Sequence, residues 1–277
     1  MSASGRLGCA VRLVAALAAV AVAGCQRRTA PSEGAEARGP AGRGSAVASA
    51  TAPATTARPA GSGEAAGLQY VERQSGGAAD EALPMVVAVH GLGDTPEHLG
   101  DALVSALERP ARIILPRGPK TYGRGYSWFD LGSNEAMLAG IERATALVAG
   151  GLGELVKRRP TRGKPIVLGF SQGGTIAFAL GAKHPALVGA AFPVAGLLPP
   201  PLVPPPGSGA LPPFVAFHGA DDRVVPAQLA RESVERLKAI GARAEVHVYD
   251  GLGHSVSPEL RNDLRREVLR ALDAAGR

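Results

Sequence analysis

The arrangement best suited to chemistry is a serine between glycines, in the motif GFSQGG at residues 169–174. The apolar run at 165–169 predicts a buried strand before Ser171, and 175–180 predicts a helix after it. A serine on such a strand-to-helix turn projects its hydroxyl from the edge of a sheet, where the oxygen can act as a nucleophile. Glycines let the two backbones approach each other. Because 37 of the 277 residues are glycine, the motif alone is weak evidence.

A serine hydroxyl needs a base to take its proton, and four histidines follow Ser171. His184 ends the predicted helix after the serine, where it would interact with the helix dipole. His218 opens a His-Gly turn, and His247 lies within an alternating strand. His254 lies in the glycine-rich loop GLGHS after the last predicted strand, from which it can reach across the sheet. It is therefore the predicted base.

A carboxylate is expected to orient the histidine, and on a doubly wound sheet the chain order is serine, acid, histidine. The segment FHGADDRVVP places Asp221 and Asp222 directly after a predicted strand. Asp250 is a third candidate, although its closeness to His254 in the sequence favours a turn residue. Composition does not separate Asp221 from Asp222.

The negative oxygen of an acyl-transfer intermediate needs hydrogen-bond donors, each worth about 2.7–4 kcal/mol in comparable enzymes. The backbone amide of Gln172, directly after the serine, is one expected donor. The loop HGLGD at residues 90–94, after an early strand, is the expected source of the second. Its glycines allow the backbone to turn inward.

Strand-like runs alternate with helical stretches from Leu68 onward. Asn134 is a predicted N-cap, and Pro226 and Pro258 are predicted in first turns. Such alternation implies an α/β fold with a mostly parallel, doubly wound sheet, helices on both faces and reactive loops at the carboxyl ends of the strands. The expected strands are 68–72, 84–90, 111–115, 164–169, 188–194, 214–218 and 244–249, and the expected helices are 96–108, 134–159, 174–183, 226–240 and 258–275.

The proline-rich segment 199–213 interrupts this alternation. Proline removes the backbone donor that a helix interior or a central strand requires. The segment is therefore predicted to be an ordered surface loop, or a rim beside the substrate pocket.

The first residues have the pattern of an export signal. Two arginines and no acid precede a purely apolar run of twelve residues, which ends in the sequence VAGC at Cys25. The run is shorter than the about 20 residues that span a bilayer. The VAGC order resembles the bacterial lipobox, which predicts a signal peptide over 1–24 and lipidation of Cys25. Gln26 follows the cysteine, which favours the outer membrane over the inner one.

Residues 25–66 consist mainly of small residues, proline and scattered arginine, which predicts a disordered tether. The globular domain is then expected over 67–277, lipid-anchored to the cell envelope outside the cytoplasm. Residues 1–66 hold seven arginines and three glutamates, so the rest, with 23 basic and 21 acidic residues, has a net charge of only about +2. A net charge this close to zero does not support nucleic-acid binding. The domain has no cysteine, which excludes disulfides and thiolate metal sites.

Six motifs follow one another over roughly 68–275: HGLGDT (90–95), LPRGP (115–119), SWFD (127–130), GFSQGG (169–174), HGADDRVVP (218–226) and GHS (253–255). In this order they resemble the phospholipase/carboxylesterase family, a group of small α/β-hydrolases that includes the acyl-protein thioesterases. The resemblance implies that the acid is Asp222, that Ser171 is the nucleophile and that His254 is the base. It also implies that the amides of Leu92 and Gln172 form the oxyanion hole.

By the same resemblance Trp128 and Phe129 line the substrate pocket, with core packing as the alternative. The expected activity is hydrolysis of short- to medium-chain acyl esters, or of thioesters, with no metal and no organic cofactor. Two alternatives stay open: an esterase acting on surface polyesters or acetylated polysaccharides, and a non-catalytic anchored binding protein.

Overall fold

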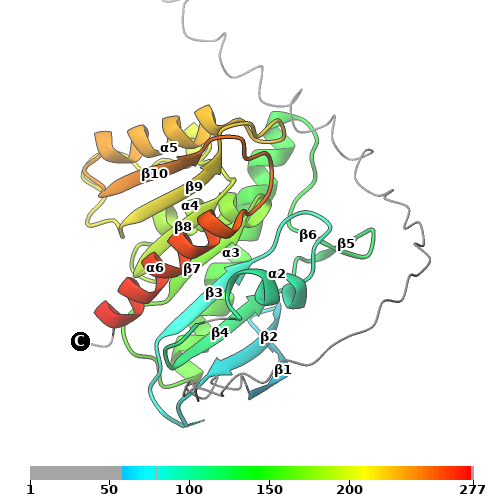
Figure 1. Ribbon diagram of the computed structural model, residues 1–277, viewed down its shortest axis with the longest axis vertical. Helices are drawn as coiled ribbons and strands as arrows, with labels where there is room; N and C mark the ends of the chain where they lie inside the picture. The colour runs from blue at the N-terminus through cyan, green and yellow to red at the C-terminus, as the bar shows by residue number, and fades with distance from the viewer. Residues whose placement is uncertain (1–57, 79, 106, 276–277) are drawn as a thin grey trace, which may run out of the picture.

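The computed structural model describes residues 58–78, 80–105 and 107–275, and within them an eight-stranded sheet forms the centre of the fold (Figure 1). Its strand order is β1-β2-β4-β3-β7-β8-β9-β10. The strands from β4 to β10 run parallel, whereas β2 is antiparallel to β4 and β1 to β2. The bounds are β1 Arg58–Ala65, β2 Leu68–Ser75, β3 Met85–Val89, β4 Ala111–Pro116, β7 Ile166–Phe170, β8 Ala190–Val194, β9 Phe214–Gly219 and β10 Ala244–Tyr249. The predicted doubly wound α/β architecture is confirmed.

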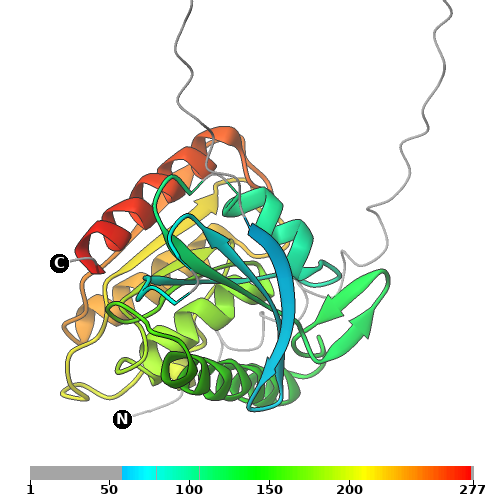
Figure 2. The same ribbon diagram turned by 90° about the horizontal axis from the view of Figure 1, so that it is seen from below.

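Helices cover both faces of the sheet (Figure 2). Helices α3, α4 and α5 pack on one face, and α2 and α6 pack on the other. None of the helices in the described part of the chain is long and apolar enough to cross a bilayer. The bounds are α2 Pro96–Leu103, α3 Asn134–Arg158, α4 Gln172–Lys183, α5 Ala227–Ala239 and α6 Pro258–Ala275.

The strand β3 shows why the central strands are almost wholly apolar. All five of its residues are buried, because successive side chains point to opposite faces and both faces are covered. Val87 and Val89 pack with α3 and α4, whereas Val86 and Ala88 pack with α2 and α6. Each fully buried valine contributes roughly 1.5–3 kcal/mol relative to an exposed one.

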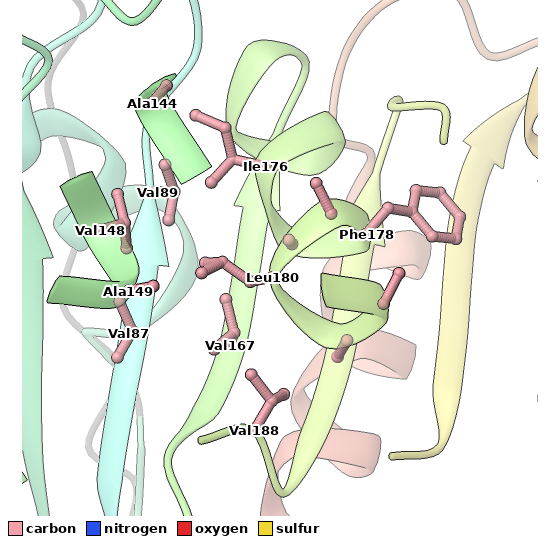
Figure 3. Close-up of a cluster of buried hydrophobic side chains, with 14 of the residues drawn as sticks. Val87, Val89, Ala144, Val148, Ala149, Val167, Ile176, Phe178, Leu180 and Val188 are labelled. Carbon is pink, nitrogen blue, oxygen red and sulfur yellow. The ribbon is translucent and has the colours of Figure 1, made fainter. Parts of the chain in front are cut away.

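Helix α4 lies in the middle of the larger core (Figure 3). Every residue from Gln172 to Ala182 is buried, so the helix is enclosed by protein around its whole circumference. Ile176 and Leu180 point toward the valines of β3 and β7, and α3 closes the layer with small residues such as Ala144. This packing fixes the N-terminus of α4, and with it Ser171.

The predicted start of the folded part is wrong. Residues 58–65 were expected in the tether, but they form β1, which pairs antiparallel with β2. Backbone hydrogen bonds of an antiparallel ladder need no apolar side chains, so composition could not reveal this strand. Ala65 is nevertheless buried in the core. The predicted signal peptide at 1–24 and Cys25 lie outside the described residues.

Several predicted details of the helices are also corrected. Helix α2 ends at Leu103 rather than 108, because Val104 leaves the helical conformation and is buried. The N-cap of α3 is Ser133, whose hydroxyl accepts from the Ala136 amide, rather than Asn134. Pro258 begins α6 as predicted, but Pro226 occupies the N-cap position of α5 instead of its first turn.

Two short segments complete the fold near the carboxyl ends of the strands. The proline-rich segment contains a single 3-10 turn, η2 (Pro200–Leu202), anchored by the buried Leu202. A small hairpin, β5 (Lys120–Tyr122) with β6 (Gly125–Ser127), projects from the body of the molecule (Figure 2). Sequence reasoning did not predict this hairpin.

Candidate active site

Ser171 occupies a strained turn between β7 and α4. Its φ of 58° and ψ of −113° lie in a region that residues with a side chain rarely adopt. Such a conformation costs on the order of 1–3 kcal/mol and persists only where neighbouring contacts fix it. The Ser171 amide donates to the Val194 carbonyl at 2.9 Å, and its carbonyl accepts from the Thr175 amide at 3.0 Å. The serine is thereby held at the carboxyl edge of the sheet.

The glycines around the serine are required by close backbone contacts. A Cβ on Gly169 would lie 2.3 Å from the carbonyl oxygen of Gly173. A Cβ on Gly173 would lie 1.9 Å from the Val89 carbonyl oxygen, and one on Gly174 would lie 2.4 Å from that of Val194. Real Cβ atoms do not approach this closely, so these contacts explain the spacing of the motif.

His254 lies beside the serine, in the loop between β10 and α6. Its Nε2 lies 2.9 Å from Oγ of Ser171, and its Nδ1 lies 2.7 Å from Oδ2 of Asp222. The carboxylate only accepts hydrogen bonds, so Nδ1 carries the proton and Nε2 is free to accept one from the serine. The Phe170 ring lies 4.9 Å from the imidazole and packs beside it.

Asp222 lies in the turn after β9, and its side chain is fully buried. Oδ1 accepts from the amides of Val224 at 2.9 Å and Val225 at 2.8 Å, while Oδ2 faces both His254 and His218. Burial raises the pKa of this carboxyl, but the hydrogen bonds from His218, His254 and Val225 lower it by more, so the net pKa is well below its ordinary value. Asp222 is therefore ionised at neutral pH.

The structure separates the three acid candidates. Asp222 contacts His254, whereas Asp221 is exposed and its amide donates to the Leu252 carbonyl. Asp250 is exposed beside the edge strand β10. The neighbouring aspartates differ because the turn after β9 directs one inward, where the Val224 and Val225 amides receive it, and the other toward solvent.

The remaining histidines differ in their surroundings. His184 occupies the C-cap of α4, as expected. Burial, and then the charge of Lys183, lower its pKa, so the neutral form of the ring is favoured over the cation that would interact with the helix dipole. His247 is exposed on β10.

His218 is buried, with Nε2 2.7 Å from the Val225 carbonyl and 3.2 Å from Asp222. Its contact with the acid was missed, although the HGADD motif places the two residues four apart.

The loop after β3 lies directly against the serine. A Cβ on Gly91 would lie 3.4 Å from Cβ of Ser171. The buried ring of His90 holds this loop: Nε2 accepts from the Gly118 amide at 3.0 Å, so Nδ1 carries the proton and donates to the Gly91 carbonyl at 2.7 Å. Burial lowers the pKa of His90, which keeps the ring neutral. Leu92 follows in this loop.

An apolar cavity of about 30 Å³ opens beside Ser171. This space holds about two water molecules, so it is narrow. Phe129 lines it as predicted, but Trp128 does not: its indole donates to the His90 carbonyl at 3.0 Å in the core. The lining residues are Phe129, Leu131, Met137, Ile141, Ser171, Gln172, Thr175, Leu197 and Val225.

A strained serine, a histidine within hydrogen-bond distance and a buried carboxylate, at the carboxyl edge of a doubly wound sheet, define an α/β-hydrolase. The sequence matches the family described as Phospholipase/Carboxylesterase over residues 76–268, and the chain belongs to that family.

Curated relatives and solved structures agree with this assignment. The chain is 29% identical over 213 residues to a probable inactive carboxylesterase of Oryza sativa subsp. japonica, covering 69% of this chain and 86% of the relative. It is 28% identical over 206 residues to acyl-protein thioesterase 1 of Gibberella zeae, covering 66% and 88%. The crystal structure of esterase PE8 aligns with a TM-score of 0.59 at 25% identity, covering 70% of this chain and 95% of that one.

Membership of this family supports a hydrolase of the esterase or thioesterase type. One relative carries the name probable inactive carboxylesterase, so membership does not by itself establish catalysis. The case for activity depends on the residues of the site.

Proposed function

We propose that the protein is a serine esterase that hydrolyses short- to medium-chain acyl esters through an acyl-enzyme. The continuous contact from Ser171 through His254 to Asp222, at 2.9 and 2.7 Å, carries the proposal. These distances lie within the range in which a general base activates a serine.

In the first half of the reaction, His254 Nε2 takes the Ser171 hydroxyl proton while Oγ bonds to the acyl carbon. The carbonyl π electrons move to oxygen, where the amides of Leu92 and Gln172 stabilise the negative charge. When the intermediate collapses, the bond to the alkoxide breaks and His254 returns the proton to that oxygen. An alcohol leaves and an ester of Ser171 remains.

In the second half, a water molecule replaces the alcohol. His254 takes its proton, the hydroxide oxygen bonds to the acyl carbon, and the carboxylic acid leaves as Ser171 recovers the proton. The ionised Asp222 stabilises the imidazolium that forms in both halves. The scheme uses only groups of this chain and water.

The cavity beside Ser171 supports a short acyl group. Its lining is apolar and it holds little free volume, so an alkyl chain of a few carbons fits without rearrangement. The similarity to acyl-protein thioesterase 1 supports thioesters of the same acids as a second group of substrates.

Labelling with a fluorophosphonate probe tests this function. The full chain, purified in detergent, should be labelled at pH 8, and Ser171→Ala should abolish labelling and hydrolysis of p-nitrophenyl butyrate. A matched control is Ser105→Ala, which removes a surface hydroxyl bonded only to the Asp101 carbonyl among the contacts described. Absence of labelling in the folded wild type would refute the proposal.

We also propose that the protein is lipid-anchored outside the cytoplasm. The support is the sequence pattern before Cys25: a basic start, a short apolar run and the VAGC order. An anchored hydrolase would meet its esters at the cell envelope.

A further inference from the structure

The side chain of Gln172 performs a task separate from that of its backbone amide. The residue is buried, and its carboxamide contacts residues 128–129, which directly follow the β5–β6 hairpin. Oε1 accepts from the Trp128 amide at 2.9 Å, and Nε2 donates to the Phe129 carbonyl at 2.8 Å. Both ends of the carboxamide are thus fixed by backbone groups of one segment.

Trp128 continues the same chain of contacts to the second loop of the site. Its indole Nε1 donates to the His90 carbonyl at 3.0 Å, and its ring lies 5.1 Å from the His90 imidazole. His90 directly precedes Gly91 and Leu92. The ring of His90 in turn fixes the Gly91 carbonyl at 2.7 Å.

These contacts join the two proposed halves of the oxyanion hole. One half is the Gln172 amide at the start of α4, and the other is the Leu92 amide in the loop after β3. The ladder between β3 and β7 ends at the pair Val89 and Gly169, so it brings both segments to one edge of the sheet but includes neither donor. Beyond that pair, side-chain contacts also connect the loop to the start of α4. From the Gln172 carboxamide the path runs through Trp128 to the His90 carbonyl.

We propose that Gln172, through its side chain, and Trp128 are positioning residues that set the spacing of the two oxyanion donors. The inference rests on the proposed esterase function. Donors preorganised at the correct distance stabilise the transition state more than the ground state, so a loosened spacing lowers kcat with little effect on KM. The buried carboxamide and indole, each with its partners, would otherwise be expected only to stabilise the fold.

The test compares two variants that remove single contacts. Trp128→Phe keeps a ring but removes the donor to the His90 carbonyl. Gln172→Glu keeps the acceptor for the Trp128 amide but replaces the donor to the Phe129 carbonyl with an oxygen. Each should lower kcat for p-nitrophenyl butyrate about 10- to 100-fold and change KM less than about threefold.

A transition-state analogue separates positioning from a merely structural role. Affinity for a short-chain trifluoromethyl ketone, which adds to the serine, should fall in parallel with kcat/KM. The control is Tyr249→Phe, which removes a hydrogen bond to Asp263 at the edge strand β10. It should lose a comparable amount of thermal stability while kcat and analogue affinity stay at wild-type values.

The outcomes distinguish the two proposals. If the wild type is active and the folded variants keep its kcat, the positioning role is overturned and the esterase function stands. The same holds if the variants have a lower kcat but bind the analogue with unchanged affinity. A folded but inactive wild type overturns the esterase function and this inference together.

Discussion

His218 and His254 approach the same carboxylate oxygen, Oδ2 of Asp222, at 3.2 and 2.7 Å. The Nε2 atom of His218 also lies 2.7 Å from the Val225 carbonyl. Both neighbours only accept hydrogen bonds, so Nε2 carries the proton and donates toward them. His218 thereby joins the acid to the turn that follows β9, and Asp222 is oriented from two sides.

Replacement of His218 should weaken Asp222 in a measurable way. His218→Leu removes one donor, so the pKa of Asp222 should rise toward its ordinary value of 3.8 and the midpoint of acid unfolding should move to higher pH. We expect kcat to fall about tenfold because the acid is held less firmly. Circular dichroism during acid titration, with steady-state hydrolysis at pH 7.5, measures both effects.

A conservative variant and a matched control isolate this role. In His218→Gln the carboxamide can still donate from a similar position, so it should restore part of both losses. His247→Leu makes the same change at an exposed histidine of β10 and should leave kcat unaltered. Equal behaviour of the two leucine variants would contradict the role of His218.

Removal of the charge on Asp222 should affect catalysis and the pH dependence of stability. Asp222→Asn should lower kcat by about 10³- to 10⁴-fold, because the amide no longer fixes the His254 tautomer or stabilises the imidazolium. The folded-state pKa lies below the unfolded value, so the ionised form contributes stability above that unfolded value, 3.8, which is lost as the pH falls through the folded-state pKa.

Urea unfolding at a series of pH values measures the second effect. The difference in free energy of unfolding between wild type and Asp222→Asn should be constant from about pH 7 to 5 and should shrink below about pH 4. A difference that grew on acidification would contradict the assigned pKa direction.

The sequence predicted elements whose pattern is local. Helices α3 and α6 and the buried strands have clear periodicity and boundaries, so their predicted ranges differ from the structure by a few residues at most. The serine, histidine and aspartate candidates follow from the same logic, because parallel strands bring the loops at their carboxyl ends together. The structure places Ser171 and Asp222 each within hydrogen-bond distance of His254.

Features that depend on distant contacts could not be predicted in this way. β1 is defined by its pairing with β2, and the sequence of β1 has no apolar alternation. The motif left Trp128 either in the pocket or in the core, and its indole hydrogen bond to the His90 carbonyl holds it in the core. Nothing local distinguishes an aromatic ring that lines a cavity from one that packs behind it.

The close contact at Gly173 allows a prediction about the turn. Gly173→Ala would place a Cβ 1.9 Å from the Val89 carbonyl oxygen, which neither backbone can avoid. We expect a loss of at least about 3 kcal/mol in the free energy of unfolding, together with loss of probe labelling. Gly153→Ala is the control: this glycine of α3 has nothing within 4 Å of an added Cβ, so stability should rise by about 0.5–1 kcal/mol. Equal urea midpoints would contradict the steric account.

The anchor predicts a difference between the two cysteines. In a bacterial host, the wild type should incorporate radiolabelled palmitate and sediment with membranes, and Cys25→Ala should abolish incorporation. Cys9→Ala, within the predicted signal peptide, should leave lipidation intact. A soluble, secreted wild type without label would refute the anchor while leaving the catalytic proposal untouched.

The walls of the cavity predict which residues limit acyl length. Met137 and Ile141 of α3 line the space beside Ser171, and both are buried. Met137→Ala removes part of this wall, so the preferred p-nitrophenyl ester should lengthen by about two to four carbons, at a cost of about 2–5 kcal/mol in stability. Met85→Ala truncates a buried methionine at the start of β3, at the opposite end of the strand from the site. It should lose similar stability and keep the wild-type order of kcat/KM across C2 to C12 esters. The same chain-length profile in both variants would exclude the cavity as the acyl-binding site.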